Sequence, residues 1–258
     1  MSGSVVYLDH SATTPVRPEV LEAMLPYLTE CFGNAGSIHA YGRTAKAAID
    51  RAREQVAALL NADPREIVFT SGGTESDNLA IRGRVAAAQQ TRRRVLVSAV
   101  EHHAVLHAAE YVRHHDGADV RVIPVDASGR VDPDEVASLL DGDTVVVSIL
   151  HVNNETGVAQ PIERIAELCA ERGVAFHTDA VQSAGRVPLD VRRTPVSLAA
   201  VSGHKLYAPK GVGACYVRKG IALVPQAVGG AQERGRRAGT ENVAGIVALG
   251  VACELART

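Results

Sequence analysis

The stretch VAFHTDAVQS (residues 174–183) decides how this chain folds, because it joins an apolar run to polar side chains. Val174 to Thr178 predict a buried strand, and Asp179 and Gln182 follow it. A helical pattern from Pro161 to Arg172 precedes this strand. A helix that leads into a buried strand is the repeating unit of a parallel sheet covered by helices.

The same alternation extends in both directions along the chain. Short apolar runs predict seven strands: Ile67–Thr70, Val95–Ser98, Val120–Val125, Val145–Leu150, Val174–Thr178, Val196–Val201 and Gly213–Val217. Helical periodicity covers Arg17–Leu28, Arg43–Leu60, Thr74–Ala88, Ala104–His115, Pro133–Leu140, Pro161–Arg172 and a last helix from about Glu241 that still runs at Thr258. We expect Asp132 to cap one helix and Gly173 to end another. The predicted fold class is α/β, with a mostly parallel seven-stranded sheet covered by helices.

Composition narrows the classes of function. The 27 basic and 29 acidic side chains give a net charge of −2, so no charge excess favours nucleic acid or an anionic membrane. No apolar run approaches a membrane span and the N-terminus shows no signal pattern, so a cytoplasmic protein is expected. The cysteines are far apart without a CxxC pair, which argues against a zinc ribbon or a disulfide scaffold. Each is interpreted as a packed small residue: Cys31, Cys169, Cys215 and Cys253.

Polar residues gather where the predicted strands end. In open α/β sheets, ligands bind at the carboxyl ends of the strands. Five polar groups occupy such positions: Ser71–Thr74, Glu101–His102, Asn153–Glu155, Asp179 with Gln182, and Ser202–Lys205. We therefore predict a single site at this edge of the sheet.

The loop Ser71-Gly72-Gly73-Thr74 joins a strand to a helix. Its glycines let the backbone approach an anion, and the N–H groups of the first helical turn then bind it. The loop lacks the GxGxxG and P-loop motifs, so a monophosphate suits it better than a dinucleotide or triphosphate. Considered alone, an ordinary tight turn explains the loop about equally well.

Asp179 and Lys205 each allow two interpretations. A carboxylate after a strand usually caps a helix or closes a turn, which is favoured for Asp179 alone, but it can also pair with a protonated pyridine nitrogen. A loop lysine is by default solvated, whereas an amine beside an apolar or cationic site can lose its proton and form a Schiff base. The competing amines are few: Lys46, Lys210 and Lys219.

The histidines and asparagines are also ambiguous. His102 fits a core residue, a surface residue or an aromatic plate over a planar cofactor, and the first two together are favoured without context. Asn153 and Asn154 either close a turn or bind a ligand. The ten histidines show no metal-ligand spacing such as HExxH, so no metal site is predicted.

Taken together, the motifs of this chain resemble those of one family. The matching segments, in order, are YLDHSATTP (7–15), FTSGGTESDN (69–78), EHHAVL (101–106), HVNNETG (151–157), HTDAVQS (177–183), SGHK (202–205) and RAGTEN (237–242). Any one is weak, but the ordered set is specific and extends over nearly the whole chain. The chain resembles the cysteine desulfurases, which are class V aminotransferase-like enzymes of the fold type I pyridoxal phosphate (PLP) group.

The resemblance implies a role for each candidate site residue. Lys205 would hold PLP covalently and move protons at the α-carbon of the substrate. Asp179 would pair with the pyridine nitrogen, and Gln182 would hydrogen-bond the phenolic oxygen. His102 would stack on the ring, and Asn154 would lie near the phenolic oxygen or the substrate carboxylate.

The resemblance also implies how the phosphate is held. Backbone and side-chain groups would bind it from within one subunit: Gly73, Thr74, Ser202 and His204. Thr240 would reach the same phosphate from the second subunit of a homodimer, so the dimer would complete the site.

The implied reaction converts L-cysteine to L-alanine and passes the sulfur to an enzyme cysteine as a persulfide. A sulfur-acceptor protein, for example in iron–sulfur cluster assembly, would then receive it. The alternatives are another class V enzyme, such as a selenocysteine lyase, a C–S lyase or an aminotransferase, or a truncated cofactor-binding protein without turnover. Alanine release separates enzymes from the binding protein, and persulfide formation separates desulfurase from lyase.

The resemblance predicts two parts in this chain. Residues 1–15 would form an N-terminal arm, which belongs to the small domain in the family, and residues 16–258 would form the large PLP-binding domain. Members of the family continue into a C-terminal small domain that holds the persulfide cysteine and an arginine for the substrate carboxylate. We expect this chain to lack that domain and therefore to be inactive alone.

Overall fold

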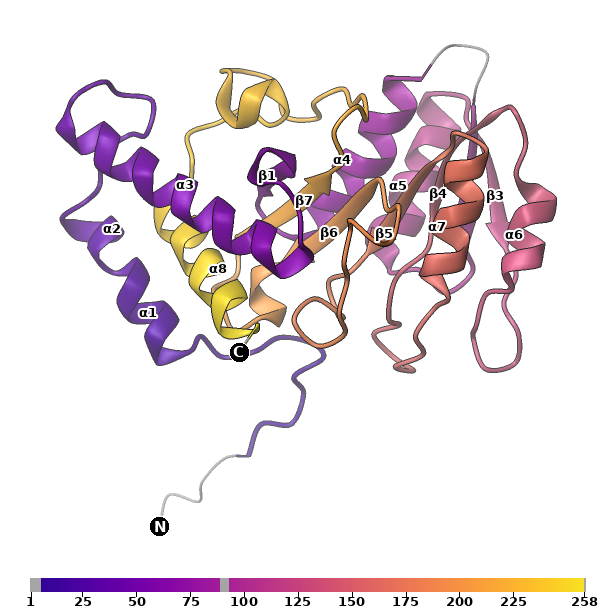
Figure 1. Cartoon of the computed structure of the whole chain (residues 1–258), viewed down its shortest axis with the longest axis horizontal. Helices are drawn as coiled ribbons and strands as arrows, with labels where there is room; N and C mark the ends of the chain where they lie inside the picture. The colour runs from indigo at the N-terminus through magenta and orange to yellow at the C-terminus, as the bar shows by residue number, and fades with distance from the viewer. Residues whose placement is uncertain (1–5, 89–92, 258) are drawn as a thin grey trace.

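A seven-stranded sheet forms the centre of the computed structural model, which describes residues 6–88 and 93–257 (Figure 1). The strands are β1 (Ile67–Thr70), β2 (Arg94–Ser98), β3 (Asp119–Ile123), β4 (Thr144–Ser148), β5 (Ala175–Asp179), β6 (Leu198–Ser202) and β7 (Gly213–Val217). Their order is β1-β7-β6-β5-β4-β2-β3. β7 runs antiparallel to both neighbours and the other pairs are parallel, so the predicted mostly parallel sheet is confirmed.

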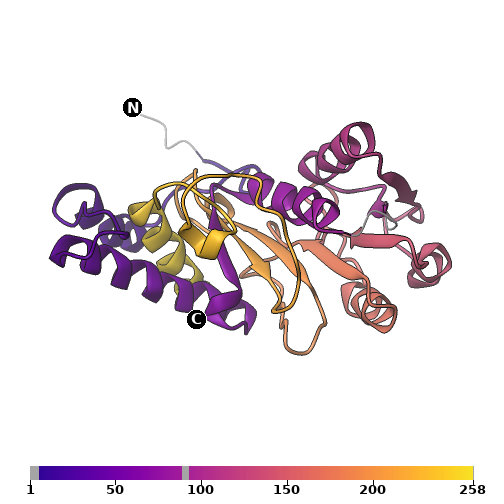
Figure 2. The same ribbon diagram turned by 90° about the horizontal axis from the view of Figure 1, so that it is seen from above.

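Helices cover both faces of this sheet (Figure 2). They are α1 (Pro18–Met24), α2 (Pro26–Thr29), α3 (Ala40–Leu60), α4 (Gly73–Ala86), α5 (His103–His115), α6 (Pro133–Leu139), α7 (Ile162–Glu171) and α8 (Val243–Leu255). Short 3₁₀ turns lie at Pro64–Glu66, Gly203–Lys205 and Gln232–Gly235. The two predicted helix ends are confirmed, since the Asp132 side chain accepts a hydrogen bond from Asp134 N and Gly173 follows α7 with φ +64°.

Two helix predictions were wrong in extent. The helix expected over Arg17–Leu28 is two helices that meet at Leu25 and Pro26, because proline cannot donate the backbone hydrogen bond that a continuous helix requires. The last helix ends at Leu255 and is followed by a turn, whereas it was expected to run on to Thr258, which lies outside the described residues.

The core is divided by the sheet into two sides. Alternate strand residues point to opposite faces, so Phe176 packs in the cluster that includes α3, α7 and α8, whereas its neighbour Ala175 packs in the cluster with α5. His177 and Asp179 continue the Ala175 series along β5. They therefore lie on the face of the sheet that α4 and α5 cover. Towards the carboxyl end of β5, the side chains on this face are polar instead of apolar.

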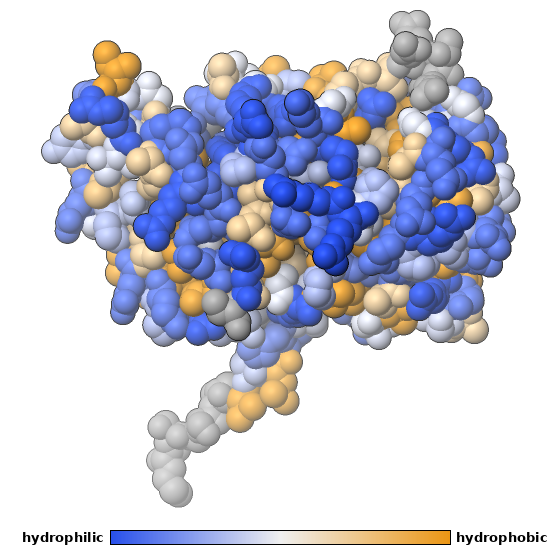
Figure 3. All heavy atoms as spheres, in the orientation of Figure 1, coloured by the Kyte–Doolittle hydropathy of each residue, from blue (hydrophilic) through white to orange (hydrophobic). Residues whose placement is uncertain are grey.

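An N-terminal arm without regular structure, residues 6–15, leads into the body of the protein. The face shown in Figure 3 is mostly hydrophilic, whereas the start of the arm is apolar: Val6 is 73% exposed and Leu8 is 84% exposed. Further along, Thr14 is buried, and its N–H donates to the carbonyl oxygen of His204 at 2.9 Å. The arm is thus fixed to the loop that contains Lys205. Among the described helices, none is long and apolar enough to cross a membrane.

Candidate active site

A cavity of about 530 Å³ lies at the carboxyl ends of the central strands. Nine of the ten site residues predicted from the sequence line it: Gly73, Thr74, His102, Asn154, Asp179, Gln182, Ser202, His204 and Lys205. They come from five separate segments of the chain, and the parallel sheet brings these segments to one edge. The structure therefore brings these five segments together at one edge of the sheet.

The N-terminus of α4 forms one wall of the cavity. A side chain at Gly73 would place its Cβ 2.6 Å from Val181 Cγ2, so Val181 would have to shift to make room for it. Ser202 lies next to Gly73, and the His204 ring, whose Nδ1 is 3.2 Å from Thr13 Oγ1, lines the same cavity. An open helix N-terminus with hydroxyl and imidazole groups beside it can bind a phosphate.

Lys205 is half-buried and faces the N-terminal arm. Its Nζ donates to the carbonyl oxygen of Ala12 at 2.9 Å and also contacts the carbonyl oxygen of Ser11. Burial lowers the pKa of Lys205, and the nearby Arg186 guanidinium lowers it further. A lowered amine pKa favours the neutral form that reacts with carbonyl groups. Lys210, the main competitor in the sequence, is exposed and does not line this cavity.

Asp179 closes a turn and also lines the cavity. Its Oδ1 accepts a hydrogen bond of 2.8 Å from Val181 N, which closes the turn after β5. The residue nevertheless lines the cavity at only 7% exposure. Burial, and after it the nearby Asp77 carboxyl, raise the pKa of Asp179 to about 7. A cation in the cavity would favour the ionised carboxylate and reverse this shift.

Among the other candidates, His102, Gln182 and Asn154 line the cavity, whereas Asn153 does not. His102 caps α5, since its Nδ1 accepts from Ala104 N at 3.1 Å, and its exposed ring lines the cavity. Gln182 Nε2 donates to Ser11 O at 2.9 Å. Asn154 lines the cavity, whereas Asn153 closes a turn by accepting from the backbone N–H groups of residues 155 and 156. The turn interpretation thus holds for Asn153.

Thr240 is exposed and is not brought to this cavity. Its loop is fixed at two points: Arg53 and the buried Glu233 form a 2.6 Å ion pair, and Arg237 Nε lies 2.9 Å from Glu75 Oε1. Glu75 belongs to the first turn of α4, so the loop is anchored next to the glycine-rich wall of the cavity.

Sequence reasoning assigned no role to two buried carboxyl groups near the cavity, those of Asp77 and Glu101. Asp77 of α4 lines the cavity floor at 1% exposure, and its carboxylate lies within 4.8 Å of ligand atoms of His102 and Asp179. Glu101 is also buried; it contacts Ser98 Oγ at 2.5 Å and accepts from Leu150 N at 2.8 Å. The available signal was positional, because Asp77 lies one helical turn after Gly73 and so faces the sheet.

These residues fit PLP as a bound group. The helix N-terminus, with Ser202 and His204, suits the phosphate, and the buried Asp179 suits a protonated ring nitrogen. Lys205 offers an amine of lowered pKa in the same cavity. The size and polarity of the cavity and the chemistry of these groups all agree with the cofactor that the sequence predicts.

Comparison with known proteins gives the same family. Residues 6–258 match the model of the aminotransferase class-V family. The chain is 53% identical to the cysteine desulfurase IscS of Methanosarcina thermophila, over 97% of this chain and 62% of that protein. It is 49% identical to the cysteine desulfurase IscS of Dictyoglomus turgidum, over 97% of this chain and 64% of that protein. The chain thus spans less than two thirds of these curated relatives.

Solved structures agree with this result. A NifS-like protein superposes with a TM-score of 0.94 at 40% identity, over 98% of this chain and 69% of that one. A structure described as SspA in complex with cysteine also gives a TM-score of 0.94, at 41% identity, over 97% of this chain and 72% of that one. The described fold and the match of the family model over residues 6–258 lead to one conclusion: this chain belongs to the aminotransferase class-V family.

Proposed function

We propose that this chain is the PLP-binding part of a cysteine desulfurase, with residues 1–15 as an arm and residues 16–258 as the large domain. The observation that supports this most strongly is the cavity, which brings together the amine of Lys205, the carboxyl of Asp179 and the N-terminus of α4. The high identity to proteins named cysteine desulfurase supports the choice of substrate.

Each residue has a distinct task in this proposal. When bound, PLP withdraws electrons from the α-carbon of an amino acid bonded to it. Lys205 Nζ anchors the cofactor and then moves the proton at the substrate α-carbon, aided by its lowered pKa. Asp179 holds a positive charge on the ring nitrogen, and Gln182 binds the phenolic oxygen. His102 covers one face of the ring.

Further residues bind the phosphate of the cofactor and the polar groups of the cofactor ring or the substrate. The phosphate is held by the N-terminus of α4 and neighbouring side chains: Gly73, Thr74, Ser202 and His204. Asn154 lies near the phenolic oxygen or the substrate carboxylate. Thr240 completes the phosphate site from the other subunit of a homodimer.

Sulfur transfer requires a thiolate that attacks the sulfur of the substrate. The C–S bond of L-cysteine breaks and an S–S bond forms, so that L-alanine and a protein persulfide are the products. Three cysteines are buried and have a raised pKa: Cys169, Cys215 and Cys253. Cys31 does not line the cavity. We therefore assign the attacking thiolate to a part of the protein outside residues 1–258, in a C-terminal small domain.

The last part of the proposal concerns the sulfur acceptor and where in the cell it receives the sulfur. The persulfide sulfur passes to an acceptor protein in the cytoplasm, with iron–sulfur cluster assembly as the expected pathway. The family resemblance is what supports these assignments.

The proposal is tested with the full-length protein that contains these residues, loaded with PLP. L-Cysteine should yield L-alanine in equal amount to protein-bound persulfide during a first turnover without acceptor. Alanine and free selenide from L-selenocysteine, but no persulfide from L-cysteine, would indicate a selenocysteine lyase. Pyruvate with free sulfide would indicate a C–S lyase, and amino-group transfer to a keto acid would indicate an aminotransferase. Binding of PLP without any of these products would leave a cofactor-binding protein.

A further inference from the structure

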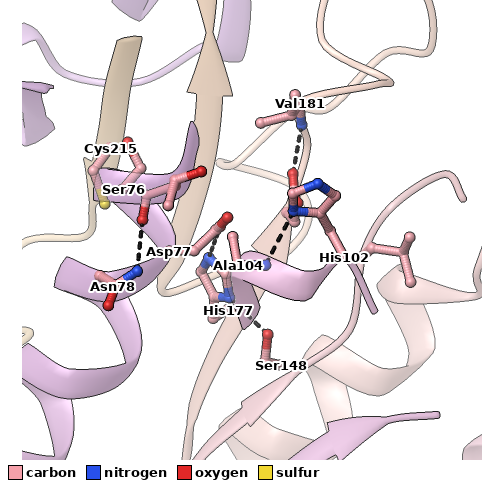
Figure 4. Close-up of polar contacts among 12 residues, drawn as sticks. Ser76, Asp77, Asn78, His102, Ala104, Ser148, His177, Val181 and Cys215 are labelled. Atoms are coloured by element: carbon pink, nitrogen blue, oxygen red, sulfur yellow. Dashed lines mark hydrogen bonds and ion pairs between the residues drawn. The ribbon is translucent and has the colours of Figure 1, made fainter. Parts of the chain in front are cut away.

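Asp77 and His177 form a buried pair directly below the cavity. Asp77 Oδ1 lies 3.4 Å from His177 Nε2, and neither atom has another hydrogen-bond partner among the described residues. Both side chains are at most 1% exposed. The second ring nitrogen, Nδ1, is 2.8 Å from Ser148 Oγ, so the imidazole is held between a hydroxyl and a carboxyl group (Figure 4).

The register of the sheet positions this chain of polar groups. Ser148 at the end of β4 pairs with His177 of β5 across the parallel ladder, so their side chains share one face. Asp179, two residues further along β5, lies on that face too. Helix α4 covers the face and supplies Asp77 from its second turn. The pair is therefore built into the scaffold that holds Asp179.

The surroundings of Asp77 are rich in acidic groups. Asp179 approaches from β5 and Glu101 from the end of β2, and both are buried. His102 faces Asp77 from the start of α5, and the Cys215 thiol faces it from β7. Neighbouring buried carboxyl groups cannot all be ionised without cations, because each charge raises the pKa of the others.

We propose that Asp77 is held as a neutral acid that donates a hydrogen bond to His177 Nε2, so that Asp179 keeps the negative charge of this carboxyl pair for the cofactor ring. His177 is then neutral, with its Nδ1–H donating to Ser148 Oγ. In this arrangement every polar atom of the imidazole has a partner and the Asp77–His177 unit has no net charge. Asp77 and His177 are positioning residues, since they act through Asp179. The inference depends on the PLP site of the proposed function.

The direction in which burial shifts each pKa agrees with this geometry. Burial raises the pKa of Asp77 to about 8 and lowers the pKa of His177 to about 4. Both directions favour the uncharged forms near neutral pH. If Asp77 lost its proton, two carboxylates, those of Asp77 and Asp179, would lie near the single ring nitrogen of the cofactor. The negative charge of Asp77 would then have no cation to pair with.

The first test measures the proton on Asp77 without any cofactor. The infrared spectrum of the PLP-free protein at pH 6.5 should contain the C=O stretch of a protonated carboxyl that disappears in Asp77→Asn. The matched control, Asp126→Asn, changes an exposed carboxylate whose pKa is lowered by hydrogen bonds from Ser128 and its neighbours, and it should leave that band intact. Identical protonated-carboxyl bands in Asp77→Asn and the parent would overturn the proposal.

The second test compares two substitutions by PLP affinity and by the pH dependence of the bound cofactor's absorption. Asp77→Asn keeps a neutral donor toward His177 Nε2 and should bind PLP within about threefold of the parent, whereas Asp77→Leu should bind at least about tenfold more weakly. The pH at the midpoint of the absorption change of bound PLP should likewise shift in Asp77→Leu and stay unchanged in Asp77→Asn. Equal losses in both variants would show that Asp77 acts through a negative charge and would overturn the proposal. If the parent protein fails to bind PLP, the proposed function fails, while the infrared result still decides the state of Asp77.

Discussion

Lys205 Nζ donates a hydrogen bond of 2.9 Å to the carbonyl oxygen of Ala12, although 193 positions separate the two residues in the chain. The arm also receives a hydrogen bond from Gln182, at Ser11 O. The arm thus covers the amine and a second cavity side chain at the same time. A bound cofactor that uses the Lys205 amine must displace these contacts, so cofactor binding and the position of the arm are coupled.

Lys205 is expected to be the site of covalent attachment. Borohydride reduction of the PLP-loaded protein, followed by peptide mapping, should place the label on Lys205. Lys205→Ala should abolish the label, whereas the control Lys210→Ala, which changes an exposed turn residue outside the cavity, should retain it. A label on Lys210 in the parent protein would contradict the assignment.

Replacement of Asp179 by Asn should weaken PLP binding. The substitution replaces the charged carboxylate, which accepts a hydrogen bond from the protonated ring nitrogen, with a neutral amide. A hydrogen bond that involves a charged group is worth about 1.5–3 kcal/mol, so the Kd should rise about 10- to 100-fold. Spectroscopic titration with PLP measures this change. Asp190→Asn, at a half-exposed carboxylate in another turn, serves as the control and should leave the Kd unchanged. An unaltered Kd in Asp179→Asn would leave Asp179 with its turn-closing role alone.

Most of the fold was predictable because its elements have periodic patterns. All seven strands were found at their sites, since strands such as β4, β6 and β7 consist mainly of apolar residues. The break at Pro26 was missed because the apolar spacing continues across it, and only the missing backbone N–H stops the helix.

The sequence also predicted part of the candidate site, but not all of it. Residues at strand ends, such as Asp179 and Lys205, are marked by their position after apolar runs. Asp77 lies within a helix, and its partner His177 lies within a strand, so neither follows such a run. Their contact depends on how α4 lies against β5, which a single sequence does not give. The contacts of the irregular arm with Lys205 have no periodic signal either.

The cofactor-free protein should lose stability as the pH rises from 6.5 to 8. Burial raises the pKa of Asp179 to about 7 and that of Asp77 to about 8, so the folded state holds protons that the unfolded chain has already released. The free energy of unfolding then falls with pH, by at most about 1.4 kcal/mol per pH unit for each such proton. The lowered pKa of His177 has the opposite effect, but only between about pH 4 and 6.5, where the unfolded histidine binds a proton.

Urea denaturation at several pH values measures this dependence. Asp179→Asn should show a shallower fall between pH 6.5 and 8 than the parent, because one of the titrating groups is gone. Saturating PLP should also reduce the slope, since a cation beside Asp179 lowers its folded-state pKa. Stability that increases over this interval in the parent protein would contradict the burial of protonated carboxyls.

Thr240 is expected to act on the site of the other subunit. Mixing inactive Lys205→Ala and weakened Thr240→Ala full-length proteins into heterodimers tests this directly. If Thr240 acts across the interface, one of the two sites has native Lys205 and receives native Thr240, so PLP affinity at that site returns to the parent value. If it acts within its own subunit, every site has one defect and no native affinity returns. Thr44→Ala, at an exposed position on α3, provides the control.

The last prediction is that residues 1–258 alone exchange the α-proton of L-cysteine but form no persulfide. Exchange needs Lys205, Asp179 and the N-terminus of α4 that would bind the phosphate, all of which line one cavity. Persulfide formation needs an exposed thiolate that reaches the substrate. Burial raises the pKa of Cys169 and Cys253 to about 12 and raises that of Cys215 as well. Cys31 is half-exposed, contrary to the packed residue expected, but it follows α2 and does not line the cavity.

The experiment supplies its own positive control. PLP-loaded residues 1–258 are incubated with L-cysteine in deuterated water, and deuterium at the α-carbon shows that the cavity is folded and competent. In the same sample, alanine should stay at background, and alkylation with peptide mapping should find no persulfide on any of the four cysteines. Deuterium exchange without alanine places the missing step at the attacking thiolate, because every earlier proton transfer has then been observed. Catalytic alanine release with a persulfide mapped to Cys31 would instead show that this chain holds its own sulfur acceptor, and that the arm or α2 moves far enough to deliver it.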